Sequence, residues 1–545
     1  MVDVTTASLS AVAGTYTPYR VMRRQLGAYY TPRSAAEYLA AWAVRRDGDR
    51  VLEPSLGDGA FLRAVAASAT GKGLSDIVLS GAEIDPAPLV ASIGAGLIDA
   101  DHAHLGDFLA ITPFPVDAVV GNPPFVRLRH LPIDQRDHAL AAAHAVLGQG
   151  LEPSGSVWLP FVLHATRFLA LGGRMGIVLP YEATYVRYAR PLWAALGVRF
   201  GSLRVIRTHE RLFADIYQDV VLLLADDYGA CTTTVQYNAY ERINELVAER
   251  PIVEEQIPIA DLARGDRAFI TALLQDELRE LLLGKLAPLL APARDRVTLN
   301  IGYVSGDKEF FHPSEDIIAR YKLPERSLRS TVISTRALRG AGLYTAAAPE
   351  KTTARLFLPS KGAPGKAELQ YIEYGDQIGV SNRYKCRARK PWYVTLDTRV
   401  PDVIVSVFSE RPVLMVNDAE CLASNSLLCG FIKRGTAAEL VTAWYTSLTL
   451  LQCEIEVHAL GGGVLVMIPG ETSNVLLPHT VTASSAHLAA LNGMLQIGTP
   501  NAAYRIGDQD VLQDQLGLTR REIKIIQEGA EMLAYWRTSA RSSLA

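Results

Sequence analysis

The sequence predicts an α/β protein, with a Rossmann-like domain first and a mainly β or mixed domain after it. Three observations support this fold class. Helical and strand patterns alternate through about residue 230, as in a parallel sheet flanked by helices. Residues 51–62 join an apolar strand, a glycine-containing turn and a helix start. Beyond residue 297 the composition changes to short β-like runs with many turn residues.

A chain of 545 residues exceeds one ordinary hydrophobic core, so we expect several domains. The alternating patterns place the first domain at residues 1–230. Charged helical patterns predict a helical connector over 231–296. The turn-rich runs predict a domain over 297–490, and a helical segment follows over 491–545.

Periodicity, prolines and glycines locate the elements of the first domain. An Ala-rich helix over 33–45 opens after Thr31-Pro32, because proline is tolerated at a helix start. A second helix is expected over 160–171, and the strand at 175–180 is apolar on both faces and therefore buried. The remaining elements are a helix over 191–196 and strands over 203–206 and 219–224.

Bulk properties set limits on the chemistry. A net charge of −3 and a pI near 6.4 do not indicate nucleic-acid binding, so a DNA partner requires local basic surface. The five cysteines form no C-x-x-C pair, which predicts free thiols and no metal site. No charged start precedes an apolar segment, and no apolar run approaches about 18 residues. We therefore expect a cytoplasmic protein with no membrane partner.

The most informative motif is Asn122-Pro123-Pro124-Phe125, which follows the apolar run 116–121. Open α/β sheets bind their ligands at such strand ends. The Asn122 side-chain oxygen and the Pro123 carbonyl can accept the two hydrogens of an exocyclic amine, which concentrates electron density on its nitrogen. Phe125 can stack on the ring and hold the amine in line with a methyl donor. The motif predicts methylation of such an amine; the alternative is an ordinary turn.

Upstream segments favour methylation. Gly57 and Gly59 let the backbone approach a ligand closely, although the spacing is not G-x-G-x-x-G and implies no phosphate. Glu83 ends a second strand, where it can accept hydrogen bonds from ribose hydroxyls. Asp107 and Phe108 suit an adenine amino group and face. Singly, Glu83 is also explained as a solvated strand end and Phe108 as core. Their order and spacing before the motif are a strong signal together.

With these motifs the N-terminal half resembles the γ-class, TaqI-like DNA adenine-N6 methyltransferases. That family has a T-P element, E-P-x-x-G-x-G, E-I-D-P, D-F and N-P-P-[YF] in this order, followed by a target-recognition domain. The matches cover about residues 27–225. Leu56 departs from the family, which often has a small residue there, but the departure hardly affects the assignment.

The resemblance implies S-adenosylmethionine as the cofactor. The Tyr30-Thr31-Pro32 element would close over it, and Glu53 and Pro54 would lie beside its methionine part. Glu83 would bind the ribose and Ile84 would lie against the adenine. The cofactor-binding residues expected on this basis are Tyr30, Thr31, Pro32, Glu53, Pro54, Gly57, Gly59, Glu83, Ile84, Asp107 and Phe108.

The resemblance also implies a second aromatic ring, which sandwiches the extruded base opposite Phe125. Phe213 resembles that position, although residues 214–217 depart from the usual proline-containing loop. Tyr217 is the second choice, and burial of Phe213 in the core is the alternative. The expected catalytic residues are Asn122, Pro123, Pro124, Phe125 and Phe213.

Two segments of the C-terminal region point to DNA recognition. Residues 301–311 resemble the G-x-x-[TS]-G-x-x-x-F start of the family's recognition domain. Residues 383–393 form the densest basic stretch and are interleaved with aromatics, which suits phosphate and guanine contacts. The alternative is a solvated edge strand protected by its charges and proline. The expected DNA contacts are Arg383, Lys385, Arg387, Arg389, Lys390 and Trp392.

We therefore expect a site-specific adenine-N6 methyltransferase that acts on a flipped-out base of double-stranded DNA, in a restriction-modification or phage-defence system. An N4-cytosine methyltransferase remains open, although such enzymes usually carry Ser in place of Asn122. Methylation of a protein glutamine or an rRNA guanine also remains open, as does a DNA-binding protein with a degenerate methyltransferase fold. Since only a short segment precedes Thr31-Pro32, we expect any restriction endonuclease or defence subunit to be a separate chain.

Overall fold

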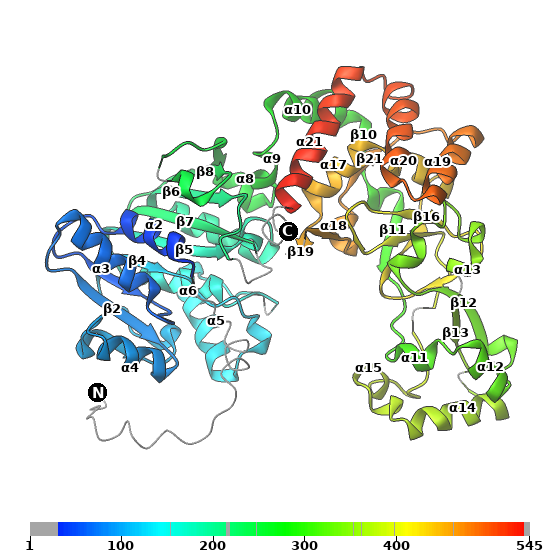
Figure 1. The fold of residues 1–545 in the computed structure, drawn as a ribbon, viewed down its shortest axis with the longest axis horizontal. Coiled ribbons are helices and arrows are strands. Elements are labelled where there is room, and N and C mark those ends of the chain that lie inside the picture. Colours follow the sequence, from blue (N-terminus) through cyan, green and yellow to red (C-terminus); the bar gives the residue numbers. More distant parts are fainter. Residues whose placement is uncertain are drawn as a thin grey trace. The chain divides into compact units, whose positions relative to one another are not determined.

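The computed structural model describes residues 31–152, 154–213, 219–246, 248–352, 354–360, 362–396, 398–460 and 463–538. The chain divides into two compact units, residues 1–273 and residues 274–545 (Figure 1). Within the described residues, no helix is long and apolar enough to cross a membrane.

The first unit is built on one large sheet, whose order in the described residues is β3-β2-β1-β4-β5-β7-β6-β8-β9. Neighbouring strands from β3 to β5 are parallel, and β7 runs antiparallel between β5 and β6. The strands are β1 (Arg50–Glu53), β2 (Val78–Glu83), β3 (Ala103–Leu105), β4 (Val116–Gly121), β5 (Leu169–Pro180), β6 (Phe200–Thr208), β7 (Val220–Tyr228), β8 (Thr234–Tyr240) and β9 (Val253–Pro258). The predicted Rossmann-like α/β class is confirmed.

The helices of the first unit include those predicted over 33–45 and 191–196. They are α2 (Arg33–Ala43), α3 (Ala60–Lys72), α4 (Pro86–Gly94), α5 (Ile133–Leu147), α6 (Trp158–Ala165), α7 (Arg190–Gly197), α8 (Ile259–Arg264) and α9 (Ala268–Thr271). Helix α6 is shorter than the helix predicted over 160–171, because the chain turns after it and enters β5 at Leu169.

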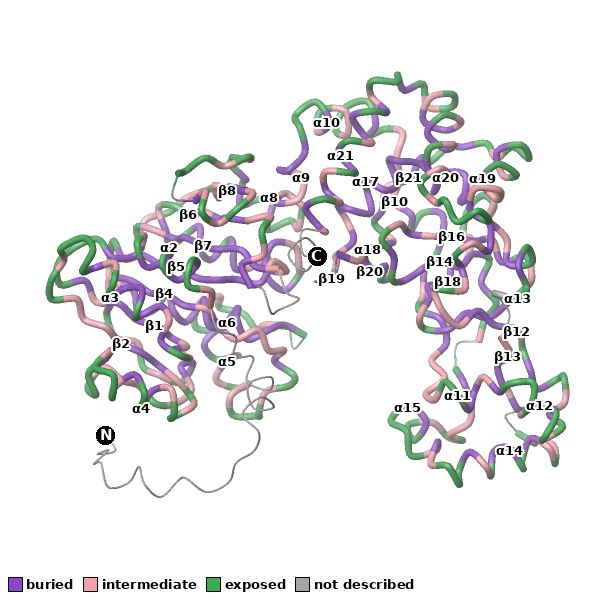
Figure 2. Tube along the Cα trace, in the orientation of Figure 1, coloured by how far each residue is buried: buried purple, intermediate pink, exposed green. Residues whose placement is uncertain are grey.

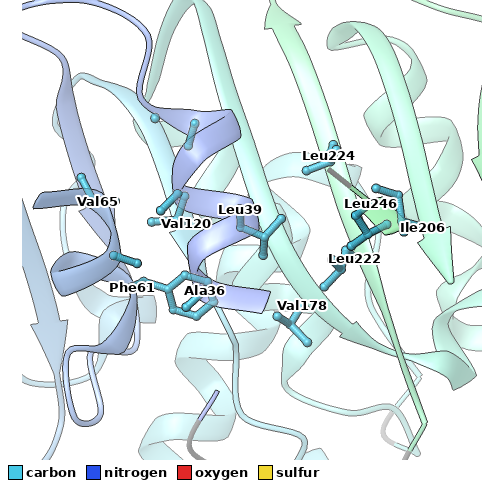
Figure 3. Packing of buried hydrophobic residues seen from close by; sticks show 14 of the residues in the cluster. Ala36, Leu39, Phe61, Val65, Val120, Val178, Ile206, Leu222, Leu224 and Leu246 are labelled. Atoms are coloured by element: carbon cyan, nitrogen blue, oxygen red, sulfur yellow. The ribbon is translucent and has the colours of Figure 1, made fainter. Parts of the chain in front are cut away.

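One hydrophobic cluster fixes α2 and α3 against the sheet. Figure 3 shows Leu39 of α2 and Phe61 of α3 beside Val120 of β4 and Val178 of β5. All residues of β5 from 175 to 180 are buried, so both faces of this strand are covered (Figure 2). Because α3 and the carboxyl ends of β1 and β4 share one core, the loops between them have a rigid support.

Residues 231–258 differ from the predicted helical connector. Strand β8 pairs in parallel with β6, and β9 pairs antiparallel with β8, so both extend the sheet. Val235, Tyr237 and Ala239 alternate with more polar residues and are buried. This period of two, with β-branched and aromatic residues, favours a strand over a helix.

The second unit contains several small sheets. In the described residues their orders are β11-β18-β14-β16, β13-β12-β17, β15-β20-β19 and β10-β21. The strands are β10 (Leu290–Pro292), β11 (Val297–Ile301), β12 (Leu328–Val332), β13 (Ala354–Phe357), β14 (Val403–Ser406), β15 (Phe408–Ser409), β16 (Leu414–Val416), β17 (Leu422–Ala423), β18 (Leu427–Ile432), β19 (Ala459–Leu460), β20 (Val464–Val466) and β21 (Leu476–Pro478).

Helices complete the second unit and make it mixed. They are α10 (Asp276–Leu281), α11 (Lys308–Phe311), α12 (Glu315–Tyr321), α13 (Pro349–Thr352), α14 (Lys366–Gln377), α15 (Tyr384–Arg387), α16 (Ala437–Trp444), α17 (Ser447–Glu456), α18 (Pro469–Thr472), α19 (Ser485–Ile497), α20 (Pro500–Gly507) and α21 (Arg520–Thr538). The last helix is part of the core, since Arg537 of α21 forms a buried ion pair with Glu454 of α17, at 2.7 Å.

Candidate functional site

A cavity of about 1220 Å³ lies in the first unit, where β1, β2 and β4 end. Glu53 is the last residue of β1, Glu83 is the last residue of β2, and Asn122 follows β4. The sheet order reverses between β1 and β4, and open α/β sheets bind ligands at such a switch point. The predicted residues that line the cavity are Thr31, Glu53, Pro54, Gly57, Glu83, Ile84, Asp107, Phe108, Asn122, Pro124 and Phe125.

Backbone N–H groups fix the carboxylate of Glu83 at the cavity wall. One oxygen accepts a hydrogen bond from Gly57 N at 2.8 Å, and the other accepts from Ile84 N at 2.9 Å and Asp85 N at 3.0 Å. The bond to Gly57 ties the loop after β1 to the end of β2. Glu83 therefore has a defined orientation at the cavity wall. The alternative, a solvated strand end, does not account for these three hydrogen bonds.

Glu53 is a buried carboxyl group in the cavity wall, only 2% exposed. It accepts a hydrogen bond from Leu62 N, at the start of α3, at 3.2 Å. Burial raises its pKa well above the usual value, and the nearby carboxylates Asp58 and Glu83 add to that effect. A cationic ligand in the cavity would offset this cost, because an opposite charge favours the carboxylate.

Gly57 and Gly59 shape the loop between β1 and α3. Both have positive φ angles, 52° and 75°, which favour glycine over residues with a side chain. A Cβ atom at Gly57 would meet nothing within 4 Å, so the backbone of this residue borders open space in the cavity wall.

Asp107 and Phe108 follow β3 and are held by different contacts. Asp107 accepts from Leu109 N at 3.0 Å, and its other oxygen lies 2.8 Å from Nδ1 of His138 on α5. Phe108 is 3% exposed and stacks on Phe168, with ring centroids 5.2 Å apart. His138 was not predicted from the sequence, because only the fold brings α5 against this loop.

The Asn122–Phe125 motif is supported by the loop after β1. Ser55 Oγ donates to the backbone carbonyl of Asn122 at 3.0 Å. A Cβ atom at Gly121 would lie 3.1 Å from Pro54 Cδ, so glycine allows the close approach of β4 to this loop. Neither contact has a local signal in the sequence.

Three further aromatic residues were predicted in the site: Phe213, Tyr217 and Tyr30. Phe213 is 5% exposed and belongs to the hydrophobic cluster under α2, against which Phe125 also packs. The structure thus places Phe213 in the core, which was the alternative interpretation, and not in the cavity wall. Tyr30 and Tyr217, the other two, lie outside the described residues.

The basic stretch of the second unit forms α15 and a turn, not an edge strand. Arg389 donates to the carbonyl of Ser305 at 2.8 Å and to that of Val304. Trp392 packs on Phe310 with ring centroids 5.3 Å apart. These two partly buried side chains are engaged within this region, so they are less available for the predicted DNA contacts than the exposed basic residues of the stretch.

The other basic side chains of this stretch are exposed. Arg383 lies 3.4 Å from Asp307. Lys385 and Arg387 lie over the ring of Tyr384, at 5.4 and 5.5 Å from its centroid, and that tyrosine is 70% exposed. Lys390 is also exposed. The surface formed by Arg383, Tyr384, Lys385, Arg387 and Lys390 is called the α15 basic surface below.

The cysteines and acidic residues do not suggest a metal centre. Among the described residues, no group of three or more His, Cys, Asp or Glu side chains could hold a metal ion. Burial raises the pKa of the Cys421 and Cys429 thiols to about 11, so both are protonated at neutral pH.

Comparison with known proteins finds a matching family model in each half of the chain. A family model described as "N-6 DNA Methylase" matches residues 18–188, which include every motif that lines the cavity. Residues 18–188 are thus similar to N-6 DNA methylases. A second model, described as "Type II methyltransferase M.Eco57I, C-terminal domain", matches residues 267–512. A match to a methylase model is thus followed along the chain by a match to a methyltransferase C-terminal model, in the order that the predicted resemblance implies.

Individual relatives have low sequence identity to this chain. The type II methyltransferase M.PaeR7I of Pseudomonas aeruginosa is 24% identical over 341 residues, which cover 57% of this chain and 54% of the relative. The chain therefore spans about half the length of this relative. The type IIG restriction endonuclease BpuSI is 14% identical, with a TM-score of 0.42 over 94% of this chain and 66% of its own. A putative class I S-adenosylmethionine-dependent methyltransferase from Listeria monocytogenes is 19% identical, with a TM-score of 0.35 over 47% and 75%.

Replacing Glu83 with alanine is expected to weaken S-adenosylmethionine binding by about 1–3 kcal/mol, the cost of losing hydrogen bonds to a charged group. Calorimetry on the purified variant measures this. Asp101→Ala, an exposed acidic residue between β2 and β3, is the matched control. Unchanged affinity in the Glu83 variant would place this carboxylate outside the cofactor site.

Proposed function

We propose that this protein is a site-specific DNA methyltransferase that transfers a methyl group from S-adenosylmethionine to N6 of an adenine flipped out of double-stranded DNA. The observation that supports it most is one cavity lined both by the Asn122–Phe125 motif and by Glu53, Glu83 and Asp107. The hydrogen-bond acceptor for the target amine and the carboxylates for a nucleoside cofactor thus line the same cavity. The N-6 DNA methylase domain supports the same reaction class.

The carboxylates of the cavity wall suit the cationic part and the ribose hydroxyls of S-adenosylmethionine. Bound there, the cofactor would supply an electrophilic methyl group on a sulfonium. Glu53 would face its cationic methionine part, since a buried carboxyl with a raised pKa gains most from a positive neighbour. Glu83 would accept from the ribose hydroxyls with both oxygens already oriented by backbone N–H groups. Ile84, which is 39% exposed at the cavity wall, would cover one face of the adenine.

The substrate half of the cavity contains Asn122, Pro124 and Phe125. We propose that the Asn122 side-chain oxygen and the Pro123 carbonyl accept the hydrogens of the target amine, and that Phe125 stacks on its base. These groups raise electron density on the nitrogen and hold it in line with the methyl group, so the protein contributes positioning and electrostatics. Adenine is favoured over cytosine because Asn, and not Ser, stands at position 122.

Duplex DNA is the proposed substrate because the second unit carries the M.Eco57I-type C-terminal domain and the α15 basic surface. The overall charge of −3 makes such local basic surface necessary. Restriction-modification or phage defence is the proposed setting, with a separate endonuclease or defence subunit as the proposed partner. The type II methyltransferase relative supports that setting.

Sequencing DNA modified by the purified protein, with detection of methylated bases, tests the proposal. We expect N6-methyladenine at one short sequence. N4-methylcytosine would establish the second candidate reaction. Methylation of rRNA or of a protein glutamine in parallel assays, with unmodified DNA, would overturn the proposal.

Replacing Lys385 and Arg387 together with alanine is expected to weaken DNA binding and to lower the slope of log Kd against log salt by about 2, since each lost phosphate contact removes about 0.9. Salt-titrated binding measures this slope. Arg329→Ala, an exposed cation on β12, is the control. If the double variant binds as the wild type does at every salt concentration, the α15 basic surface is only solvated.

A further inference from the structure

Arg127 lies two residues after the Asn122–Phe125 motif and lines the same cavity. Its backbone is fixed by a short antiparallel bridge to Ser156. Val157 N donates to the Val126 carbonyl at 2.8 Å, and Leu128 N donates to the Gly155 carbonyl at 2.9 Å. The chain therefore presents this arginine from a rigid segment.

The guanidinium of Arg127 is oriented by Glu182, which follows β5. Nη2 of Arg127 lies 3.0 Å from Glu182 Oε2. The other oxygen of Glu182 accepts from the Tyr188 hydroxyl at 2.6 Å and lies 3.5 Å from Nε1 of the buried Trp158. The Tyr188 ring also lies under the guanidinium, 5.8 Å from Cζ to the ring centroid. Two aromatic side chains thus hold the carboxylate that holds the arginine.

Folding stability does not explain the contacts that orient Arg127 and Glu182. The side chains of Arg127 and Glu182 are 39% and 17% exposed, and ion pairs with that much solvent contact contribute little free energy of folding. A guanidinium has five N–H donors, while the pair with Glu182 engages Nη2, so a ligand can bind the same group.

The charges around the cavity point to an anionic ligand at Arg127. The wall near the proposed cofactor site contains Glu53, Glu83 and Asp107, which repel phosphates. Arg63, another cation of the wall, also has a carboxylate partner, Asp58 at 3.2 Å, but it lies on α3, beside the proposed cofactor site. Arg127 instead lies in the segment that continues from the base-stacking ring Phe125, where a flipped nucleotide would bring its flanking phosphates.

We propose that Arg127 binds a backbone phosphate next to the extruded nucleotide and that Glu182 is its positioning residue; this inference rests on the proposed function. A guanidinium binds phosphate through two parallel N–H···O bonds, which fixes direction as well as distance. Holding the phosphate would hold the sugar and the base behind it, so the target amine would meet Asn122 in one orientation. Extrusion costs stacking and pairing energy, and a phosphate contact at the cavity would offset part of that cost.

The test compares Arg127→Ala, Arg127→Lys and Glu182→Gln with Arg187→Ala as the matched control. Arg187 forms a 3.0 Å ion pair with Glu152 in the same region, but its side chain is 78% exposed. We expect Arg127→Ala to raise KM for DNA about tenfold, a typical loss for one charge-assisted bond. The slope of log Kd against log salt should fall by about 1. The affinity for S-adenosylmethionine and the melting temperature should not change.

The other variants separate charge from orientation. Arg127→Lys should keep the wild-type salt slope while KM for DNA stays several-fold raised, because an ammonium restores the charge without the bidentate geometry. Glu182→Gln should raise KM less than Arg127→Ala does, and Arg187→Ala should behave as the wild type does.

Two results would overturn this inference and leave the proposed function intact. The first is a wild-type salt slope and KM in Arg127→Ala. The second is a fall in melting temperature and cofactor affinity that accounts for the lost activity of this variant. Arg127 would then be a structural ion-pair partner. A wild-type protein that methylates no DNA would overturn the proposed function, and this inference with it.

Discussion

Asn122→Ala is expected to slow methyl transfer to DNA by about 10²–10³-fold while S-adenosylmethionine still binds. The change removes a side-chain acceptor for the target amine but leaves Glu53 and Glu83 in place. Losing one preorganised hydrogen-bonding group that acts in the transition state typically costs about 10²–10³-fold in turnover. Single-turnover methylation on duplex DNA measures the loss, and calorimetry measures cofactor affinity.

Ser55→Ala is the informative companion to this variant. Its hydroxyl binds the backbone carbonyl of Asn122, so its removal should loosen the motif without removing the amine acceptor. We expect a smaller fall in turnover than in Asn122→Ala. If Asn122→Ala methylates DNA at near the wild-type rate, the proposed role of the motif has no basis.

Asp49→Ala is expected to destabilise the first unit by about 3–5 kcal/mol, because it leaves a buried arginine without its counter-charge. Asp49 is 3% exposed and pairs with Arg174, which is 1% exposed on β5. The same carboxylate accepts from the backbone N–H groups of Arg45 at 2.8 Å and Arg46 at 3.1 Å. Burial lowers the pKa of Arg174, and Asp49 opposes that effect.

Denaturant unfolding, followed by a probe in the first unit, measures this change, because two units need not unfold together. Arg46→Ala is the control, since its side chain is 70% exposed and its contact with Asp49 is long, at 3.9 Å. It should cost less than about 1 kcal/mol. A similarly small cost for Asp49→Ala would show that Arg174 is solvated or paired elsewhere.

Asp49 and Glu53 lie at opposite ends of β1, and substitutions at the two ends should affect different properties of the protein. Asp49 precedes the strand and pairs with Arg174 of β5, which also donates to the Ala43 carbonyl at the end of α2. Glu53 ends the strand inside the cavity wall. Folded Asp49→Ala protein should therefore bind S-adenosylmethionine as the wild type does, which separates its effect from that of Glu83→Ala.

The sequence by itself determined the fold class, the domain family and most of the cavity wall. Glu53, Glu83 and Asn122 each follow an apolar run, and the ends of parallel strands gather at one edge of a sheet. Once the strands were recognised, their terminal residues had to lie near one another. The glycines after β1 likewise follow from local backbone geometry, since both take positive φ angles.

Only the tertiary structure decided which side chains are available and what holds them. Phe213 is buried by packing under α2, and Arg389 is engaged by carbonyls 84 and 85 residues earlier in the chain. The partners of Asp107 and Arg127 are 31 and 55 residues away, and Asp49 is 125 residues from Arg174. Local patterns of hydrophobicity specify helices, strands and turns. They do not show whether a charged or aromatic side chain faces solvent, a ligand or a distant backbone carbonyl. That choice is made by long-range packing, which has no local signal.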